Sequence, residues 1–543
     1  MGVKNIHSGT VAVVGNGPVG QTTALLLARW GIRVVLLDGR PERDPIGSKA
    51  ICQQRDVLEV WEAVGVGRRI ADEGVTWEIA RTFHRDTELF AQPFVDHGRS
   101  EFPPFVNISQ TRTEQLMDEA IAAQPSIDVR WDHTVTSVDQ DEHEVRLHCE
   151  TSSGPVTVTA DHVVLAAGSR ARDLRRQLGV EFPGRSFDDK FLICDIRADI
   201  PGWGNERRFH FDPEWNPGRQ VLIHPCPDST FRIDWQVPGD YDLDAEAESG
   251  ALDRRIRRII GDVDYEIVWK SVYRFHARLA DRMRVGRILL AGDCAHIVSP
   301  FGARGLNSGV LDAENAAWKL AFVLRGWAGD SLLDSYDLER RAAARENLDV
   351  TAATMDFLVP QDDEQAARRL GILEAAHTDE QACRLVDSGR LSEPFWYVDS
   401  PLTTADPERP FGGRPERGHS PDPVPGVLVP DLPVTVRGRG ETRLRSIARD
   451  GFLLLHGDDV DPALLRDIAL TATSAPLRIH ALPEIDHTGL LASVLEAKPH
   501  EVWIVRPDAH IAAVVDGSDT GAVFTALRRA QGQCAAAPQV LAS

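Results

Sequence analysis

Three glycines at the end of a short apolar run constrain the fold of this chain more than any other feature. The run "TVAVVG" (10–15) is typical of a buried strand, and "VGQTTALLLARWG" (19–31) after it has helical spacing. Gly15, Gly17 and Gly20 permit a tight turn, close approach of a pyrophosphate to the backbone, and packing of the helix on the strand. The pattern predicts a β-α-β unit that binds a dinucleotide at the helix N-terminus.

An acidic residue, Asp38, closes the next strand, "RVVLLD", where a carboxylate can accept hydrogen bonds from ribose hydroxyls. A second glycine-rich stretch, "GDCAHIVSPFGARGLNSG" (292–309), also connects a strand to a helical segment, with Asp293 at its start. The N–H groups of Leu306 and Asn307 at that helix N-terminus suit a ring that gains negative charge, as reduced flavin does. Two nucleotide-handling stretches favour FAD over NAD as the bound cofactor.

Composition argues against several classes of partner. Hydrophobic residues make up 42% of the 543 and charged residues 26%, as in an ordinary globular protein. The formal net charge of -22 argues against a nucleic acid or an anionic membrane as partner. Seven cysteines without a CxxC pair indicate neither a zinc ribbon nor a dithiol site. With no signal peptide and no apolar run near the roughly 18 residues of a membrane helix, we expect a cytoplasmic protein.

The patterns along the chain predict an α/β protein with an inserted, mostly β region. Helical and buried-strand patterns alternate in residues 1–75, 105–184 and 276–345, where we expect the FAD-binding domain. Short alternating strands in 76–104 and 185–275 predict a β-sheet domain that contacts the substrate.

The remaining residues are expected to form a helical segment (346–400), a linker rich in Pro and Gly (401–425) and a small α/β unit (426–543). Residues 307–350 are also expected to be helical, overlapping both the last part of the first domain and this helical segment. In the first domain, "TRTEQLMDEAIAA" predicts a helix over 111–123, with the N-cap at Thr111 or Thr113.

Both glycine stretches resemble motifs of the group A flavoprotein aromatic hydroxylases, the family of p-hydroxybenzoate hydroxylase and 3-(3-hydroxyphenyl)propionate hydroxylase. "VAVVGNGPVG" with Asp38 resembles the ADP-binding motif, and "GDCAHIVSPFGARGLNSGVLDAENAAWKL" resembles the second FAD motif. The resemblance implies a Rossmann-like FAD-binding domain, the inserted β substrate domain, and a C-terminal thioredoxin-like domain that lacks the dithiol.

The same resemblance implies the residues that contact FAD. In "NISQTRTEQLM", Gln110 would contact the ribityl or adenosine part, and Lys49 stands where the family usually has an arginine. Asp293 would bind the ribityl or pyrophosphate region, and Pro300 would lie at the reactive face of the flavin. The full implied set is Gly15, Gly17, Pro18, Gly20, Asp38, Gly39, Arg40, Lys49, Gln110, Asp293, Pro300, Gly305, Leu306 and Asn307.

One departure from the family concerns the nicotinamide cofactor. In "VVLAAGSRARDLRRQLG", Ala167 occupies the position of an expected aspartate, whereas Gly168 and Arg170 are retained. The sequence therefore leaves NADPH and NADH open as the reductant.

The expected reaction is the family's. NAD(P)H reduces FAD, O2 then gives a flavin C4a-hydroperoxide, and an electron-rich phenolic or polyketide-like ring attacks it. A histidine can act as the base near neutral pH. The candidates for catalysis are Pro300, His210, His224 and Tyr273, and those for substrate binding are His210, His224, Arg232, Trp235 and Tyr273. His296 is interpreted as a structural hydrogen-bonding residue.

Other functions also fit this scaffold. A flavin oxidase or a Baeyer–Villiger oxygenase would use the same fold, and Ala167 gives weight to a flavin-binding protein without turnover. The expected partners are a small aromatic substrate and O2, without nucleic acid or membrane, and the chain is expected to be a monomer or a homodimer.

Overall fold

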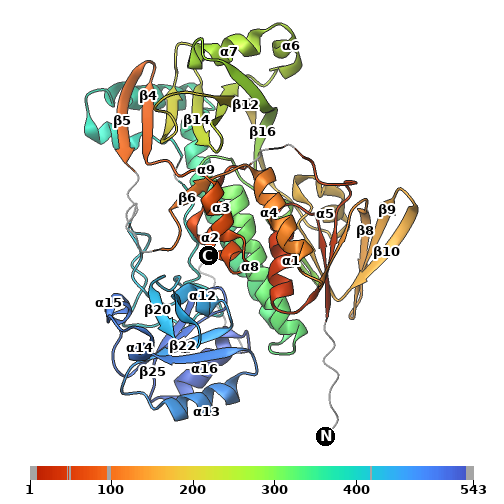
Figure 1. Ribbon diagram of the computed structural model, residues 1–543, viewed down its shortest axis with the longest axis vertical. Coiled ribbons are helices and arrows are strands. Elements are labelled where there is room, and N and C mark those ends of the chain that lie inside the picture. The colour runs from red at the N-terminus through yellow and green to blue at the C-terminus, as the bar shows by residue number, and fades with distance from the viewer. Residues whose placement is uncertain are drawn as a thin grey trace.

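The computed structural model describes residues 9–45, 47, 50–93, 100–389, 391–415 and 419–533. In Figure 1 a β-rich region lies at the top, an α/β region in the middle, and a second α/β region, in blue, at the lower left. Within these ranges, no helix combines the length and the apolar character needed to cross a membrane.

A six-stranded sheet forms the base of the middle region. Its order is β17-β18-β11-β1-β2-β7, and every pairing is parallel except that of β17 with β18. In β1, Val11, Ala12 and Val13 are fully buried, as expected of a parallel strand covered on both faces. The strands are β1 (Thr10–Val14), β2 (Arg33–Leu37), β7 (Ile127–Arg130), β11 (His162–Leu165), β17 (Arg284–Val285) and β18 (Ile288–Leu290).

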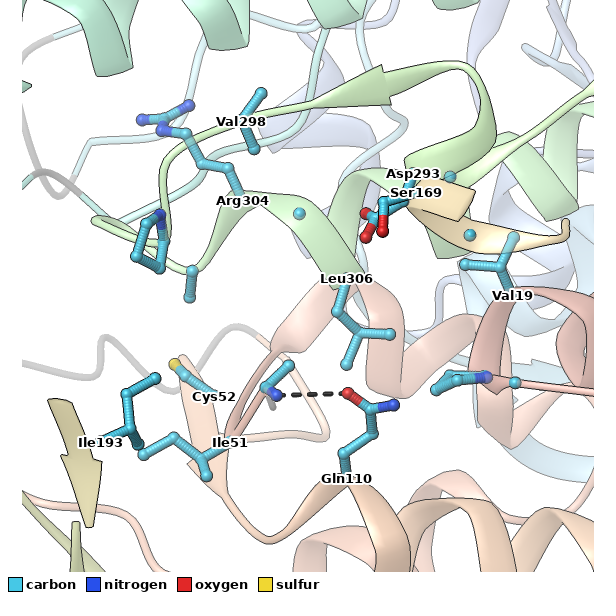
Figure 2. Close-up of a pocket in the computed structure, with 18 of the residues that line it drawn as sticks. Val19, Ile51, Cys52, Gln110, Ser169, Ile193, Asp293, Val298, Arg304 and Leu306 are labelled. Atoms are coloured by element: carbon cyan, nitrogen blue, oxygen red, sulfur yellow. Dashed lines mark hydrogen bonds between the residues drawn. The ribbon is translucent and has the colours of Figure 1, made fainter. Parts of the chain in front are cut away.

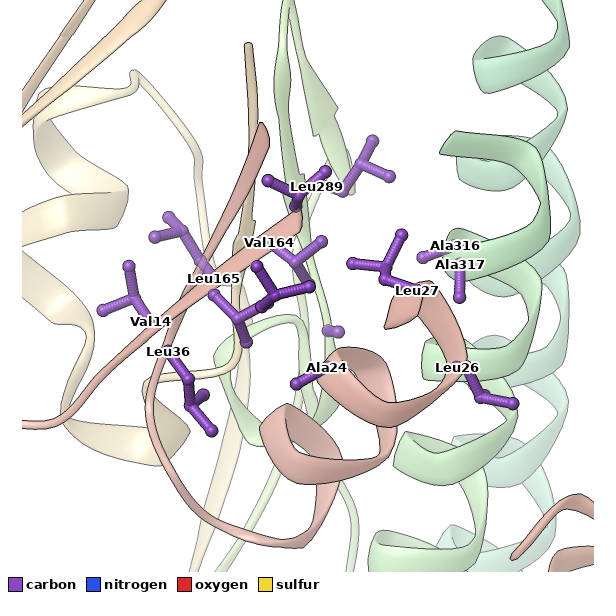
Figure 3. Close-up of a cluster of buried hydrophobic side chains, with 14 of the residues drawn as sticks. Val14, Ala24, Leu26, Leu27, Leu36, Val164, Leu165, Leu289, Ala316 and Ala317 are labelled. Carbon is purple, nitrogen blue, oxygen red and sulfur yellow. The ribbon is translucent and has the colours of Figure 1, made fainter. Parts of the chain in front are cut away.

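Helices cover one face of this sheet and a three-stranded antiparallel sheet covers the other (Figure 1). Figure 3 shows Leu26 and Leu27 of α1 between the sheet and Ala316 and Ala317 of α8. The covering elements are α1 (Pro18–Arg29), α4 (Gln110–Ala122) and α8 (Arg304–Leu324) on one face, and β8 (Thr134–Gln140), β9 (Val145–Thr151), β10 (Gly154–Ala160) and α5 (Arg172–Gln177) on the other.

The predicted cap of α4 was wrong. Ser109, and neither Thr111 nor Thr113, precedes the helix in extended conformation and accepts a hydrogen bond from the Arg112 N–H at 3.2 Å. The helix starts one residue earlier than predicted, at Gln110, so the two threonines already lie inside its first turn. The neighbouring short elements are α2 (Arg55–Glu62), α3 (Gly67–Glu73), β3 (Cys52–Gln54) and β6 (Phe105–Asn107).

The upper region is an eight-stranded sheet of order β19-β16-β12-β15-β14-β13-β4-β5. Two segments that are far apart in the sequence, residues 79–93 and 184–279, share this sheet. The described residues between them belong to the middle region. Its strands are β4 (Ile79–His84), β5 (Thr87–Pro93), β12 (Gly184–Ala198), β13 (Glu206–Phe211), β14 (Gln220–Cys226), β15 (Thr230–Val237), β16 (Tyr265–Leu279) and β19 (His296–Ile297).

The two faces of this sheet have different roles. On the outer face, Ile233 and Trp235 of β15 pack in a cluster with Leu252 and Ile256 of α7 (Ala251–Ile260), which follows α6 (Leu243–Glu248). On the inner face, Phe191 and Phe275 belong to a cluster with Met355 of α9. The helices near this face are α9 (Asp334–Leu358), α10 (Asp363–Ala375) and α11 (Glu380–Leu385). The helix predicted over 307–350 is thus split between α8 and α9 by a short 3-10 turn, Asp330–Leu333.

The C-terminal unit is a four-stranded sheet of order β23-β22-β24-β25, in which only β22 and β23 are parallel. Its identity as a thioredoxin-like domain stays a prediction. Its elements are β20 (Pro433–Val436), β21 (Gly440–Arg443), α12 (Leu444–Ala448), β22 (Phe452–His456), α13 (Pro462–Ala472), β23 (Leu477–Ala481), α14 (Leu482–Ile485), α15 (Leu490–Leu495), β24 (Glu501–Val505), β25 (Ile511–Asp516) and α16 (Thr520–Ala530).

Helix α8 joins this unit to the middle region. Its Trp318 and Phe322 are buried in one cluster with Phe452 of β22. Beside them lies a buried group of charges in which Glu339 of α9 accepts hydrogen bonds from Lys319 Nζ at 2.6 Å and from Arg506 Nη1 at 2.6 Å. The described part of the predicted linker also packs here, since the Thr404 N–H donates to Ala512 O at 2.7 Å. The C-terminal unit is therefore docked on α8 and α9 of the middle region.

Candidate active site

A cavity of about 620 Å³ lies at the carboxyl edge of the six-stranded sheet. The residues that directly follow β1, β2, β11 and β18, namely Gly15, Asp38, Ala166 and Ala291, all line it. This edge is where open α/β sheets bind their ligands. Figure 2 shows Asp293 and Leu306 of the second glycine stretch facing the same space as Gln110, Ile51 and Cys52.

The first glycine turn shapes the nucleotide end of the cavity. Gly15 has a φ of 107°, and a Cβ there would collide with the Ala166 carbonyl oxygen. Gly17 lines the cavity with no atom within 4 Å of where its Cβ would stand. Gly20 lies outside the lining, and a Cβ there would collide with the Gly15 carbonyl oxygen. The turn thus leaves the α1 N-terminus open to a phosphate group, with Pro18 as the first residue of the helix.

Asp38 lies beside this turn. Its Oδ2 accepts a hydrogen bond from the Asn16 N–H at 2.8 Å, and its Oδ1 accepts one from Arg40 Nε at 3.0 Å. Burial disfavours the charge, but the hydrogen bonds from Arg40 and Asn16 outweigh it and lower the pKa of Asp38. Asp38 and Arg40 line the cavity, whereas Gly39 packs on Thr134. Lys49 lies outside the described residues.

Gln110 is held at the cavity wall by both ends of its amide. Its Oε1 accepts a hydrogen bond from the Ala50 N–H at 3.2 Å, drawn in Figure 2, and its Nε2 donates to Glu114 Oε1 at 2.8 Å. The start of α4 therefore presents Gln110 to the cavity from the side opposite Asp293 and Leu306 (Figure 2).

A buried carboxylate holds the second glycine stretch in place. Asp312 of α8 accepts hydrogen bonds from the Gly292 N–H at 2.9 Å, from His296 Nε2 at 2.7 Å and from Arg340 Nε at 2.6 Å. His296 is therefore a structural hydrogen-bonding residue, as predicted. Gly292 itself has a φ of 61°, which turns the chain so that the Asp293 side chain faces the cavity.

The same stretch ends at the α8 N-terminus. Ala303, the cap residue, is left-handed with a φ of 56°, and Gly305 and Leu306 follow it along the cavity wall beside Pro300. Asn307 does not line the cavity, because as the fourth residue of α8 its N–H lies beyond the unpaired donors of the first turn. Its side chain instead bridges to β3, where its Oδ1 accepts the Gln54 N–H at 3.0 Å.

These observations fit an extended dinucleotide such as FAD. The cradle at Gly17, the carboxylate of Asp38, and the two helix N-termini of α1 and α8 all open on one cavity. The stretch with Ala167 in place of an aspartate also lines it, together with Gly168, Ser169 and Arg170.

The inner face of the eight-stranded sheet forms the opposite wall. Of the predicted substrate residues, His224 and Arg232 line the cavity, and so does Pro300, which was predicted to be catalytic. The residues that sequence reasoning missed include Asp234, Arg207, Phe191, Ile193, Leu222, Phe275, Phe301 and Trp77. Strand alternation contained the signal for Asp234, since in "FRIDWQV" it shares parity with Arg232.

The structure places three predicted residues elsewhere. Trp235 is fully buried on the outer face, because it lies an odd number of positions from Arg232. His210 stacks on Phe83 at 4.5 Å between ring centroids, outside the cavity lining, and burial lowers its pKa to about 4. Tyr273 packs against the inner-face cluster of phenylalanines and does not line the cavity.

Comparisons with known proteins agree with this geometry. The family described as "FAD binding domain" matches residues 8–351, more than half of the chain. A 3-(3-hydroxy-phenyl)propionate/3-hydroxycinnamic acid hydroxylase of Mycobacterium sp. (strain KMS) is 28% identical over 540 residues, which cover 95% of this chain and 90% of the relative.

Two solved structures share the fold over nearly the whole chain. The flavin-dependent monooxygenase PieE, solved with FAD and substrate, has a TM-score of 0.85 at 23% identity and covers 97% of this chain and 99% of its own. Aklavinone-11 hydroxylase, solved with FAD and aklavinone, has a TM-score of 0.78 at 22% identity and covers 98% of this chain and 100% of its own. The chain therefore belongs to the FAD binding domain family of flavoprotein aromatic hydroxylases.

Proposed function

We propose that this FAD-dependent monooxygenase hydroxylates a phenolic or polyketide-like aromatic compound with NAD(P)H and O2. The observation that carries the proposal is the single cavity of about 620 Å³. One end is lined by glycines and helix N-termini, and the other by aromatic side chains from the eight-stranded sheet and its neighbours.

The residues of the first end are those that would hold FAD. Gly17 and the α1 N-terminus would accept the phosphates, Asp38 the ribose, and the Gly305 and Leu306 amides the ring edge that gains charge. When bound, FAD supplies the redox chemistry that links NAD(P)H oxidation to O2 activation.

The residues of the second end position the ring and exclude water. Phe191 and Phe275 stack on each other with centroids 4.4 Å apart, and Phe301 meets Phe191 edge-on at 5.4 Å. This aromatic wall is buried and offers a flat apolar surface that a planar ring can cover. A reactive intermediate behind such a wall is protected from hydrolysis.

The test begins with the purified holoenzyme and a panel of phenols that includes 3-(3-hydroxyphenyl)propionate. We expect a phenol to accelerate NAD(P)H oxidation and to yield a product that contains one oxygen atom from isotopically labelled O2. Stoichiometric H2O2 without a hydroxylated product would identify an oxidase, and an ester or lactone product a Baeyer–Villiger oxygenase. A flavin that is never reduced under any condition would identify a protein without turnover.

A pair of variants tests whether the aromatic end is the substrate site. Ile193 lines the cavity and is 7% exposed, whereas Val156 is 40% exposed on β10. Ile193→Trp should fill the substrate end and reduce kcat/KM at least about tenfold while FAD stays bound. Val156→Trp, the control, should leave kcat/KM unchanged. Equal values for the two variants would contradict the assignment.

The finer expectations are part of the same proposal. The described cysteines are free thiols, which suits a reducing cytoplasm. NADPH and NADH remain alternatives, because the stretch around Ala167 lines the cavity without the expected aspartate. Comparing kcat/KM for the two nucleotides decides between them, and light scattering of the holoenzyme decides between a monomer and a homodimer.

A further inference from the structure

Polar residues run across the inner face of the eight-stranded sheet, at the wall opposite the nucleotide end. In the register of the sheet, Arg232 of β15 lies directly opposite Asp195 of β12 on one side and opposite His224 of β14 on the other. Asp234 is two residues along β15, so it faces the same way. β13 adds Arg207 to the same wall. A phenol ring held by the neighbouring phenylalanines would meet these groups with its polar edge.

The charges in this row balance only while Asp234 is ionised. Asp195 holds Arg232 in a bidentate pair, with Nε–Oδ1 at 2.8 Å and Nη2–Oδ2 at 3.0 Å, and both side chains are buried. Arg207 is a second cation, and its Nη2 donates to Ser388 O at 2.8 Å. Once Asp234 has taken up a proton, Asp195 is the remaining charged carboxylate of this row beside Arg207 and Arg232, so the wall then favours a negative charge on the bound ligand.

Two atoms in this row lack a partner among the described residues. Asp234 Oδ1 and His224 Nδ1 are both shielded from bulk water and make no hydrogen bond there. A shielded polar atom without a partner is costly, so such atoms in a cavity wall indicate a polar ligand. Both side chains line the cavity, and a single substrate oxygen between them would satisfy both.

The two groups differ in what they can do with a proton. Burial and the charges of Arg207 and Arg232 hold the pKa of His224 well below its usual range, so its imidazole stays neutral. Burial raises the pKa of Asp234 to about 7, against the opposing effect of Arg232. Near neutral pH, Asp234 can therefore accept and return a proton, whereas His224 can only share a hydrogen bond.

We propose that Asp234 is the general base that takes the substrate's phenolic proton, and that Arg207 and Arg232 stabilise the resulting phenolate while neutral His224 hydrogen-bonds its oxygen. The phenolic O–H bond breaks, an O–H bond forms on Asp234, and the negative charge moves from the carboxylate to the substrate oxygen. No electrons leave either group. This inference rests on the proposed function, and it replaces the histidines that sequence reasoning had favoured as bases.

The experiment counts protons, and it needs no turnover. Unsubstituted phenol and 3-(3-hydroxyphenyl)propionate are added to oxidised holoenzyme at pH 8, below the ~10 at which a phenol ionises in water. Binding is followed by perturbation of the flavin spectrum, phenolate by its ultraviolet band, and released protons by an indicator dye in weak buffer. The wild type should form phenolate without releasing a proton, because the phenolate's negative charge raises the pKa of Asp234 above its value in the free enzyme, so that Asp234 keeps the proton at pH 8.

Variants separate this role from a structural one. Asp234→Asn should bind the phenol and release one proton for each phenolate formed. Asp189→Asn is the matched control, since Asp189 is on β12 of the same sheet, outside the cavity lining, and bonded to Gln236 Nε2 at 2.6 Å. This control should behave as the wild type does. Arg207→Gln should reduce the phenolate fraction.

Turnover gives a second readout. Asp234→Asn should lose about 10²–10⁴-fold in hydroxylation of a phenol that binds neutral. With a fluorinated phenol that is already ionised at the assay pH, the loss should be less than about threefold, a rescue that a merely structural role would not give. Equal proton release by wild type and Asp234→Asn, or a bound phenol that stays neutral, overturns the inference while leaving hydroxylation intact. A panel in which no phenol binds overturns the proposed substrate class and this inference together.

Discussion

Replacing Glu339 by Gln tests whether the buried charges at the C-terminal unit hold the molecule together. Glu339 is 2% exposed and accepts hydrogen bonds from Asn315, Lys319, Ser400 and Arg506. The substitution keeps the shape of the side chain and removes its charge. Among the described residues, Asp508 is then the carboxylate left to this group of charges, and it pairs with Arg506 at 2.6 Å.

The magnitude follows from the two cations. The paired, charge-assisted hydrogen bonds from Arg506 are worth about 1.5–3 kcal/mol. Burial lowers the pKa of Lys319 to about 8, against the opposing effect of Glu339, so at pH 7 the variant can release this proton. Because the folded pKa of about 8 lies one unit above pH 7, releasing the proton lowers the free energy of unfolding by about 1.4 kcal/mol. We expect Glu339→Gln to lower the free energy of unfolding by about 3–4.5 kcal/mol, within the range for a broken buried ion pair.

The pH dependence identifies the lysine. In the variant at pH 7, folded Lys319 is neutral and unfolded Lys319 is protonated, so the unfolded state binds more protons and stability rises with pH. In the wild type both states are protonated below the folded pKa of about 8, so this contribution is constant there. The difference in free energy of unfolding between the wild type and Glu339→Gln should therefore shrink by about 1.4 kcal/mol from pH 7 to pH 8.

Urea denaturation of the holoenzyme, followed by tryptophan fluorescence, measures both effects. Because a chain of this length unfolds in steps, the first transition is compared. Glu408→Gln is the matched control, since Lys498 Nζ lies 2.6 Å from Glu408 Oε2 with side chains 45% and 74% exposed. It should leave the urea midpoint unchanged. The same midpoint for both variants, or a gap that widens with pH, would refute the reasoning.

Local structure also predicts the effect of substitutions at Gly17 and Gly20, at His162 and at Ser109. Gly17→Ala should fold normally but lose FAD affinity, because its Cβ enters the cavity. Gly20→Ala should instead lose thermal stability, because its Cβ collides with the Gly15 carbonyl oxygen. FAD titration and melting curves distinguish the two variants, and equal thermal stability would contradict the packing argument. Burial lowers the pKa of His162 to about 4, so between pH 6.5 and 4 the unfolded state binds a proton on this residue and the folded state does not. The free energy of unfolding of the wild type should therefore fall by about 3 kcal/mol over this range, and His162→Leu should abolish this loss in acid denaturation. Ser109→Ala should lower the free energy of unfolding by about 1 kcal/mol through the lost cap of α4, measured against Ser518→Ala, whose hydroxyl donates to Asp516 in an exposed turn.

The nucleotide end could be predicted from the sequence because its signals are local. The turn at Gly15 and Gly17 and the carboxylate of Asp38 follow directly from neighbouring strands, and parallel strands bring their carboxyl ends to one edge. Asn307 lies outside the cavity lining for a local reason as well, since α8 starts at Arg304 and the Asn307 N–H is the first that can pair within the helix.

The substrate end could not be predicted in the same way. Arg232 and Trp235 were both predicted to bind the substrate, but residues an odd number of positions apart on a strand face opposite sides of the sheet. No local pattern says which side of β15 meets the flavin, because that depends on α7 covering the outer face. The charges around Glu339 were also invisible, since their partners come from three distant segments.

The strand order of the six-stranded sheet determines how late in synthesis the nascent chain can complete this sheet. β1, β2 and α1 emerge first from the ribosome, but β11 and β18, which complete the sheet beside β1, follow much later in the chain. Helix α8, which covers α1, is later still. The nascent chain therefore carries an uncovered β1 edge, at Val11 and Val13, until residues 162–165 have been synthesised, and then an uncovered β11 edge until residues 288–290 follow. An amino-terminal fragment that ends before them would expose this edge and aggregate, so the unit of folding is the chain through α8 rather than its first glycine motif.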